Sequence, residues 1–359
     1  MSKFLDLSKD VAELTADLID IPSVSGYEKT IADVVEASLK RQPHLNVTRF
    51  GDTVVARTEL GRSERVLLAG HLDTVPLPSA TEARGSVPSR WLGEALYGRG
   101  ATDMKGGVAV QLALAHHLAR PEKDLTFVFY DHEEVEAAKS GLLRVATQAR
   151  GLLNADLAVL LEPTNGRVEA GCNGTLRLRA TTEGTAAHSA RAWMGDNAIH
   201  KLADLLATLR DYQPASVYVD GLEYREGLNA VGIGGGIAGN VIPDAAYVDI
   251  NYRFAPDKSV DQAEDHVRNL LNGYQLVRTD AAGGARPGLG NTAVQSLVSA
   301  VGGTPQPKYG WTDVARFAEL GIPAVNFGPG DALLAHTDDE HVLASDVRKC
   351  LGALLDWLT

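Results

Sequence analysis

The chain has 359 residues, of which 45% are hydrophobic and 22% charged, and its formal net charge is −12. This is the composition of a globular protein with room for about two domains. The acidic balance argues against nucleic acid or an anionic membrane surface as a partner, because both attract patches of lysine and arginine.

The first part of the chain alternates between predicted helices and strands. No apolar run approaches the ~20 residues of a membrane span, and the opening stretch lacks the apolar region of a signal peptide, so we expect a cytoplasmic protein. The predicted helices cover residues 10–21, 27–42, 105–120 and 138–150, and the predicted strands cover 64–70, 125–131 and 156–162. The third helix is apolar on nearly every side, which is typical of a buried helix. Strands alternating with helices indicate an α/β fold with a mainly parallel sheet flanked by helices.

The middle of the chain follows a different pattern. Residues 174–185 alternate between apolar and polar, as in a half-exposed antiparallel strand. Asp196 is a predicted N-cap for a helix that runs to residue 212. A strand at 245–255, a helix at 259–273 and a strand at 274–280 follow. These elements predict a compact α+β insert with one exposed sheet face.

Alternation of helix and strand resumes near the end of the chain, with a helix at 313–320, a strand at 322–328 and a helix at 344–358. We therefore predict a discontinuous domain of residues 1–174 and 285–359. A smaller domain of residues 175–284 is predicted to interrupt it.

Histidines and acids cluster at the ends of the predicted strands. In open α/β sheets, ligands bind beyond the carboxyl ends of the strands. Four separate segments place such residues there, and the turn before the buried helix adds one aspartate. The residues are His71, Asp73, Asp103, Glu133, Glu134, Glu162 and His336. One of them alone is more simply explained as a solvated loop residue, but their convergence on one edge predicts a shared metal site.

The residue types indicate which metal binds. Imidazole and carboxylate without thiolate suit zinc, or cobalt or manganese in its place, and the only cysteines, Cys172 and Cys350, are predicted to be buried. One catalytic zinc takes about three protein ligands, so this larger set favours two metals about 3.5–4 Å apart that share a carboxylate and a water. One of the two adjacent glutamates would then bind metal and the other would accept a proton. Asp73, two residues after His71, is placed to accept the second ring N–H of that histidine.

Five motifs resemble, in order and spacing, those of the dinuclear-zinc aminoacylase/carboxypeptidase metallopeptidase family. They are GHLDTVP (70–76), GRGATDMKGG (98–107), HEE (132–134), EPT (162–164) and AHTDDE (335–340). The resemblance covers essentially the whole chain and implies a zinc-peptidase-like catalytic domain with an inserted dimerisation (lid) domain. Longer stretches at 174–202, 238–257 and 308–331 are most similar to the actinobacterial desuccinylases of that family.

The resemblance implies a ligand set for two Zn²⁺ ions per chain, for which Co²⁺ can substitute. One zinc would bind His71 and Glu162, and the second would bind Glu134 and His336. Asp103 would bridge the two ions, and the peptide bond after it would be cis.

The resemblance also implies catalytic roles for Glu133, Asp73 and His188. Glu133 would be the general base, and Asp73 would orient the metal-binding histidine. His188 would reach the active site of the partner subunit in a homodimer and stabilise the oxyanion. From the residues alone, His188 is simply a loop histidine.

Three further residues match substrate-contacting positions of the family, namely Asn240, Arg253 and Arg316. Their implied role is recognition of substrate carboxylates, for which arginine offers two parallel N–H donors. Each arginine alone is also well explained as a surface charge. Two features depart from the family pattern: His132 stands where many relatives carry a small or neutral residue, and segment 77–96 lacks an aromatic-rich stretch.

The implied activity is hydrolysis of the amide bond of N-succinyl-LL-2,6-diaminopimelate to succinate and LL-2,6-diaminopimelate. The enzymatic alternative is deacetylation of acetylornithine or hydrolysis of another N-acyl amino acid, because the metal chemistry does not encode the acyl group. A metal-dependent binding protein without catalysis is an alternative of another class, and the presence of Glu133 argues against it. The sequence GGGIAG (234–239) satisfies a dinucleotide-binding pattern, but Pro243 follows where a helix would have to begin.

Overall fold

The computed structural model describes residues 4–359, which form two compact units. The first unit contains the chain up to Ala170 together with Gly288–Gln306 and Arg316–Thr359. The second contains Gly171–Pro287 and Pro307–Ala315. Within the described residues, no helix has both the length and the apolar character needed to cross a membrane.

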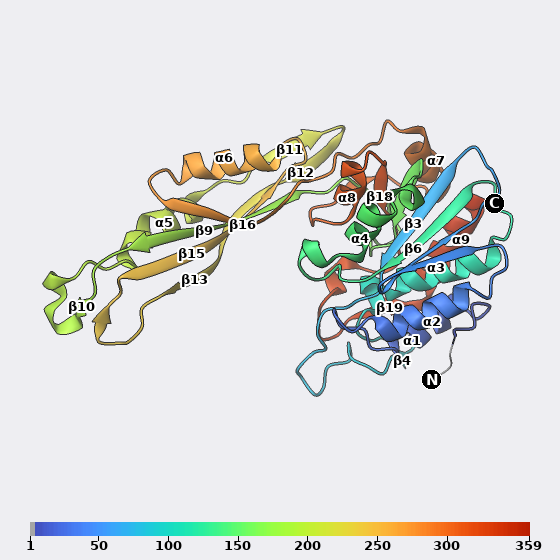
Figure 1. Cartoon of the computed structure of the whole chain (residues 1–359), viewed down its shortest axis with the longest axis horizontal. Coiled ribbons are helices and arrows are strands. Elements are labelled where there is room, and N and C mark those ends of the chain that lie inside the picture. Colours follow the sequence, from blue (N-terminus) through green and yellow to red (C-terminus); the bar gives the residue numbers. More distant parts are fainter. Residues whose placement is uncertain (1–3) are drawn as a thin grey trace. The chain divides into compact units, whose positions relative to one another are not determined.

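An eight-stranded sheet forms the centre of the first unit (Figure 1). Its strand order is β1-β2-β6-β3-β7-β18-β8-β17, and β3 runs parallel to both β6 and β7. The strands are β1 (Asn46–Phe50), β2 (Thr53–Arg57), β3 (Arg65–His71), β6 (Asp124–Tyr130), β7 (Leu157–Leu160), β8 (Glu169–Ala170), β17 (Gln306–Pro307) and β18 (Ala324–Asn326). Since β7 and β18 are also parallel while β1, β2 and β8 pair in antiparallel fashion, the parallel strands occupy the middle of the sheet.

Helices flank this sheet, which confirms the predicted α/β class. They are α1 (Val11–Ile19), α2 (Lys29–Leu39), α3 (Gly106–His117), α4 (Gly141–Gln148), α7 (Thr292–Val301), α8 (Val314–Glu319) and α9 (Ala344–Leu358). A small sheet adds β4 (Arg90–Leu92), β5 (Ala95–Tyr97) and β19 (His341–Leu343).

The core of the first unit lies where the apolar runs of the sequence meet. Every residue of β6 and of β7 is buried, and so is every residue of α3 from Gly106 to Ala115. A helix that is apolar all round has no face to present to water, so it lies inside the protein. This central position of α3 fixes the turn that precedes it, where Asp103 lies.

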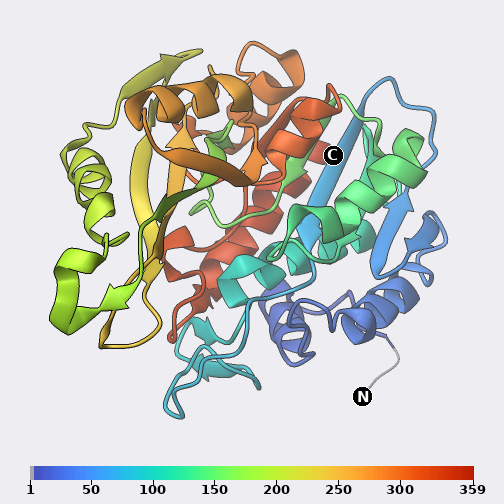
Figure 2. The same cartoon turned by 60° about the vertical axis from the view of Figure 1, so that its left-hand side comes forward.

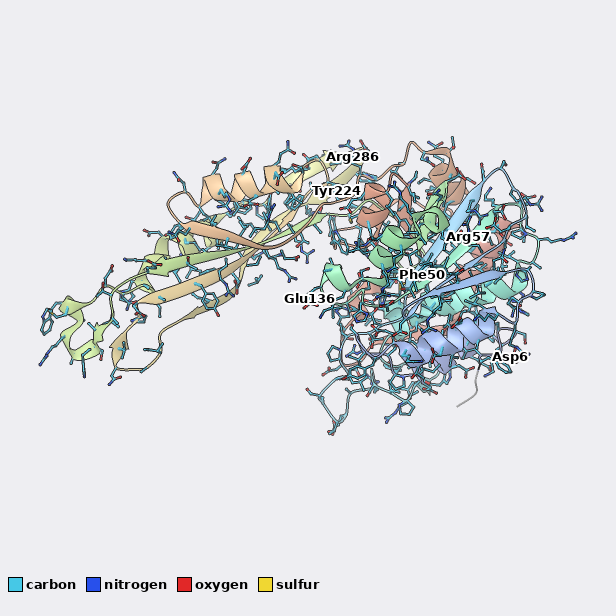
Figure 3. The ribbon with its side chains drawn as sticks, viewed as in Figure 1. Asp6, Phe50, Arg57, Glu136, Tyr224 and Arg286 are labelled. Carbon is cyan, nitrogen blue, oxygen red and sulfur yellow. The ribbon has the colours of Figure 1, made fainter. Side chains whose placement is uncertain are left out.

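The second unit is built on a four-stranded antiparallel sheet with the order β13-β15-β9-β16. Helices α5 and α6 lie against this sheet (Figure 2). Alternate residues of β15 are buried, and their apolar side chains belong to the same core as those of the two helices. The elements are β9 (Gly174–Glu183), β10 (Ala187–His188), α5 (Ala203–Asp211), β11 (Ser216–Val219), β12 (Leu222–Arg225), β13 (Gly227–Gly235), β14 (Val241–Ile242), β15 (Ala245–Phe254), α6 (Val260–Leu270) and β16 (Gln275–Ala282). Tyr224 and Arg286, labelled in Figure 3, mark the β11–β12 part of this unit, where Arg286 pairs with Asp220.

The helix predicted from Asp196 begins later than expected. Helix α5 starts at Ala203, after a single short turn (His200–Leu202). Asp196 instead forms an isolated bridge with Thr185 and an ion pair with Lys201. The backbone of Asp196 is thus used in strand-like pairing, and the side chain of Asn197 caps the turn by accepting from the N–H groups of Ile199 and His200.

Candidate active site

The parallel strands bring the predicted histidines and acids to one edge of the sheet. His71 is the last residue of β3, and Glu133 and Glu134 follow the end of β6. Glu162 lies two residues after the end of β7. Because β3 lies between β6 and β7 and runs parallel to both, these side chains meet at a common carboxyl edge.

Asp103 lies between two imidazole rings that come from distant parts of the chain. Its Oδ1 is 3.0 Å from Nε2 of His71, and its Oδ2 is 3.2 Å from Nε2 of His336. Nε2 of His336 is also 3.0 Å from Oε1 of Glu134, and Nε2 of His71 is 4.0 Å from Oε1 of Glu162. Each carboxylate oxygen of Asp103 therefore contacts a different histidine, and each histidine has a second acid beside it.

These contacts define two overlapping groups of candidate metal ligands. One group is His71, Asp103 and Glu162, and the other is Asp103, Glu134 and His336; in each, the ligand atoms all lie within 4.8 Å of one another. Ligands at the zinc distance of about 2.0–2.1 Å are roughly 3.3 Å apart in a tetrahedron, which is close to the observed separations. The structure thus brings all five predicted ligands together, with Asp103 shared by both groups.

The charges of this cluster fit metal cations. Hydrogen bonds to Asp103 and Glu134 raise the pKa of His336 to about 10. Burial opposes the charged form of His71, but its hydrogen bond to Asp103 and the nearby charge of Glu162 raise its pKa well above the ordinary value. The carboxylates therefore attract positive charge strongly, and a bound cation would replace the ring protons.

The turn after β6 explains how adjacent glutamates reach the same site. The strand ends at Tyr130, and His132 adopts a left-handed conformation with φ of 59°. The backbone N–H groups of Glu133 and Glu134 then donate to the carboxylate of Asp73, at 3.0 and 3.1 Å. Side chains that would alternate between faces in a strand are redirected by this turn. His71, Glu133 and Glu134 form a third group with ligand atoms within 4.8 Å.

Asp73 contacts His71 differently from the expectation. The ring Nδ1 of His71 lies 3.0 Å from the main-chain carbonyl of Asp73 and 3.7 Å from its carboxylate. The carbonyl can therefore accept the ring N–H and fix the tautomer that leaves Nε2 for a metal. The carboxylate of Asp73 instead accepts hydrogen bonds from the backbone N–H groups of Glu133 and Glu134 and from the hydroxyl of Ser25.

Glu340 also contacts this site, and no role for it was predicted. Its Oε1 accepts from the backbone N–H groups of Thr102 and Asp103, and its Oε2 accepts from Arg99. Its position at the end of the motif AHTDDE was the available signal. The structure contains the cis peptide bond expected between Asp103 and Met104.

The second unit places two other predicted residues next to each other. His188 in β10 pairs with Val241 in β14, and the N–H of Ser189 donates to the carbonyl of Asn240. Nδ1 of His188 accepts from the N–H of Ala190, so a neutral His188 carries its proton on the exposed Nε2. This unit therefore offers a histidine N–H donor beside Asn240.

The remaining predicted residues are divided between the two units. Arg253 lies in β15 of the second unit and donates to the side chain of Asn251. Arg316 is a largely buried residue of α8 assigned to the first unit. His132 is 2.7 Å from Asp131, and it belongs to none of the three ligand groups found among residues 4–359.

Known proteins resemble this chain over almost its full length. Residues 67–359 match Peptidase family M20/M25/M40. A Mycobacterium tuberculosis H37Rv protein, named provisionally as the succinyl-diaminopimelate desuccinylase DapE, is 55% identical over 99% of both chains. The succinyl-diaminopimelate desuccinylase of Corynebacterium glutamicum is 44% identical over 99% of this chain and 98% of its own.

The fold has a counterpart among solved structures. The M20 family metallo-carboxypeptidase Sso-CP2 from Sulfolobus solfataricus superposes with a TM-score of 0.77 over 97% of this chain and 98% of its own, at 17% identity. The family resemblance predicted from the five motifs is confirmed. The family is metal-dependent, and the first unit contains groups of residues that could hold metal ions. The chain belongs to Peptidase family M20/M25/M40.

Proposed function

We propose that this protein hydrolyses the amide bond of N-succinyl-LL-2,6-diaminopimelate, releasing succinate and LL-2,6-diaminopimelate. The observation that carries the proposal is the 55% identity, over 99% of both chains, to a protein named as this desuccinylase. The 44% identical Corynebacterium protein bears the same name. The ligand geometry of the first unit supports a hydrolytic reaction of this kind.

The proposed cofactors are two Zn²⁺ ions, for which Co²⁺ can substitute. His71 and Glu162 would hold one ion, Glu134 and His336 the other, and Asp103 both. Such cations would polarise the scissile carbonyl and lower the pKa of an attacking water. The contacts of Asp103 with both histidines support its bridging role.

Glu133 is the proposed general base. Its backbone is held by Asp73, and its carboxylate lies beside His71 and Glu134. It would take a proton from the attacking water and later deliver that proton to the leaving amine. A general base placed in this way contributes roughly 10²–10⁴-fold to the rate.

The second unit would supply oxyanion stabilisation and substrate recognition in a homodimer. We propose that Nε2–H of His188 donates to the oxyanion at the active site of the partner chain. Asn240 and Arg253 of the second unit, and Arg316 of the first, would bind the carboxylates of the substrate. Bidentate arginine contacts suit a succinylated diamino acid, which carries several carboxylates.

A comparison of substrates tests the proposed specificity. The zinc-loaded protein is assayed with N-succinyl-LL-2,6-diaminopimelate and with N-acetylornithine under the same conditions. We expect kcat/KM to be higher for the succinylated substrate. A higher value for acetylornithine would move the assignment to a deacetylase, and inactivity on a panel of N-acyl amino acids would favour a binding protein.

Substitution of Glu133 separates catalysis from metal binding. Glu133→Gln is expected to keep about two zinc ions per chain while kcat falls roughly 10²–10⁴-fold. The matched control is Glu136→Gln, in the same loop, because Glu136 is exposed and pairs with Lys139 (Figure 3). Zinc content and initial rates are measured for wild type and for both variants. A Glu133→Gln protein with wild-type kcat would refute the assigned base.

A further inference from the structure

Glu340 is a buried acid whose side chain hydrogen-bonds to the segment that carries Asp103. Only 1% of its side chain is exposed. Its Oε1 lies 3.2 Å from the backbone nitrogen of Thr102 and 3.1 Å from that of Asp103. Its Oε2 accepts from Nη1 of Arg99 at 2.8 Å. One carboxylate thus binds three donors that come from the segment before α3.

The backbone around Glu340 binds the same turn. The N–H of Gly98 donates to the carbonyl of Glu340 at 3.1 Å, and the hydroxyl of Thr102 donates to the carbonyl of His341 at 3.0 Å. The segment that follows His336 is therefore bonded along the turn that carries Asp103. The segments that carry the candidate ligands Asp103 and His336, far apart in the sequence, are therefore bonded to each other.

We propose that Glu340 is a positioning residue for the bridging carboxylate. By holding the N–H groups of Thr102 and Asp103, it fixes the direction in which the Asp103 side chain leaves the backbone. That direction sets which oxygen of Asp103 faces His71 and which faces His336. Glu340 belongs to none of the three candidate ligand groups found among residues 4–359, so we assign it an indirect role through the turn that carries Asp103. The inference rests on the proposed function only for the bridging role of Asp103.

The geometry requires a carboxylate rather than an amide at this position. A carboxylate offers acceptors on both oxygens, whereas glutamine has one acceptor oxygen and one NH₂ donor. In Glu340→Gln, the NH₂ group would face either Arg99 or the two backbone N–H groups. Each orientation opposes donor to donor, so the turn has to shift. Second-layer contacts of this kind typically change metal affinity about 10–100-fold.

Cobalt binding tests the inference directly. Metal-free Glu340→Gln is titrated with Co²⁺ and its visible absorption spectrum is recorded, beside wild type and Asp339→Asn. Asp339 is the neighbouring acid, exposed and paired with Arg84 at the surface, so it is the matched control. We expect about 10–100-fold weaker Co²⁺ binding and an altered spectrum in Glu340→Gln only. Wild-type affinity and spectrum would overturn the positioning role.

A second readout distinguishes positioning from simple support of the fold. Thermal unfolding of the metal-free proteins reports stability. A lower Tm with unchanged Co²⁺ affinity and spectrum would assign Glu340 a purely structural role and refute the proposal. The double substitution Glu340→Gln with Arg99→Met removes the opposing donor, and we expect it to recover part of the lost Co²⁺ affinity. No recovery, with both proteins folded, would also count against it.

Glu340→Asp covers the case in which the glutamine variant does not fold. It keeps the buried charge but withdraws the carboxylate by one methylene from the backbone N–H groups. Weaker Co²⁺ binding is expected, and wild-type binding would overturn the proposal. These measurements use no substrate, so they remain decisive if the protein hydrolyses a different N-acyl amino acid. Conversely, if the protein does not hydrolyse the succinylated substrate, the proposed function is refuted but the Co²⁺ binding results still test the role of Glu340.

Discussion

Glu162 owes its position to glycines that have no room for a side chain. A Cβ atom on Gly328 would clash with the carbonyl oxygens of Leu161 and Glu162, because it would lie closer to them than van der Waals contact allows. A Cβ atom on Gly107 would meet the carbonyl of Leu161. Backbone atoms cannot move aside as flexible side chains do, so any larger residue must displace the strand end that carries this candidate ligand.

Gly328→Ala should therefore affect both stability and metal binding. We expect a loss of about 1–3 kcal/mol in the free energy of unfolding, the usual cost of overpacking. We also expect weaker binding of the cation proposed to bind His71 and Glu162. Gly352→Ala is the control, since Gly352 lies inside α9 with no atom near its Cβ position. That change should stabilise by about 0.5–1 kcal/mol, because alanine favours helix. Urea unfolding and zinc analysis of both variants test this, and equal behaviour would contradict it.

The sequence predicted the ligands more completely than their supporting contacts. Residue type and position in the chain predicted the cluster of histidines and acids. The family resemblance then singled out His71, Asp103, Glu134, Glu162 and His336 as its ligands. The carbonyl of Asp73 and the backbone donors around Glu340 could not be predicted, because main-chain groups occur at every position and carry no sequence signature. Contacts through the backbone become visible only when the turns are known in three dimensions.

At the scale of single elements, the start of β6 is held by hydrogen bonds to a buried carboxylate. The carboxylate of Asp124, its first residue, accepts from the hydroxyl of Thr58 and from the N–H groups of Leu60 and Arg62. Burial opposes the charge of Asp124, but these donors and the nearby Arg65 lower its pKa below the ordinary value. The loop before β3 is thereby tied to the strand next to it.

The lowered pKa of Asp124 makes stability depend on acid pH. An acid whose pKa is lower when folded contributes stability above its unfolded pKa, about 3.9, and loses it as the pH falls through the folded value. Asp124→Asn should cost about 1.5–3 kcal/mol at pH 7 and show a shallower decline in stability below about pH 4. Urea unfolding of metal-free protein across this range tests it. Glu64→Gln, an exposed acid, is the control and should match wild type at pH 7.

Elements were predicted well where one pattern dominated. The buried helix α3, the apolar strands β6 and β7 and helix α6 agree with the predictions from the sequence. The helix expected from Asp196 was misplaced at its start, because cap preference is a local signal. Pairing of Asp196 with Thr185 is a contact between segments and overrode it.

At the scale of the whole molecule, the predicted site residues are divided between two units. The first contains all five candidate ligands, and the second contains His188 and Asn240. Each unit has a core of its own, with Leu176, Leu205 and Val267 among the buried residues of the second. In a symmetric dimer each subunit presents the same surface to the other, so a residue that one subunit supplies to its partner's site is supplied to both sites.

The proposed role of His188 in the partner's active site predicts complementation between two inactive variants. Glu133→Gln and His188→Ala chains are co-expressed with different tags, and heterodimers are isolated by two affinity steps. One site then combines an intact Glu133 with the intact His188 of the other chain, while the second site lacks both. We expect each homodimer to be nearly inactive and the heterodimer to show about half the wild-type rate, since a symmetric dimer has two equivalent sites.

If His188 acted within its own chain, neither chain of the heterodimer would contain a complete set. The heterodimer would then be as inactive as the homodimers. Sedimentation of the wild-type protein gives an independent check, because an active monomer is incompatible with a histidine supplied by a second subunit. A heterodimer with recovered kcat, together with a dimeric wild type, would assign the second unit a catalytic role beyond assembly.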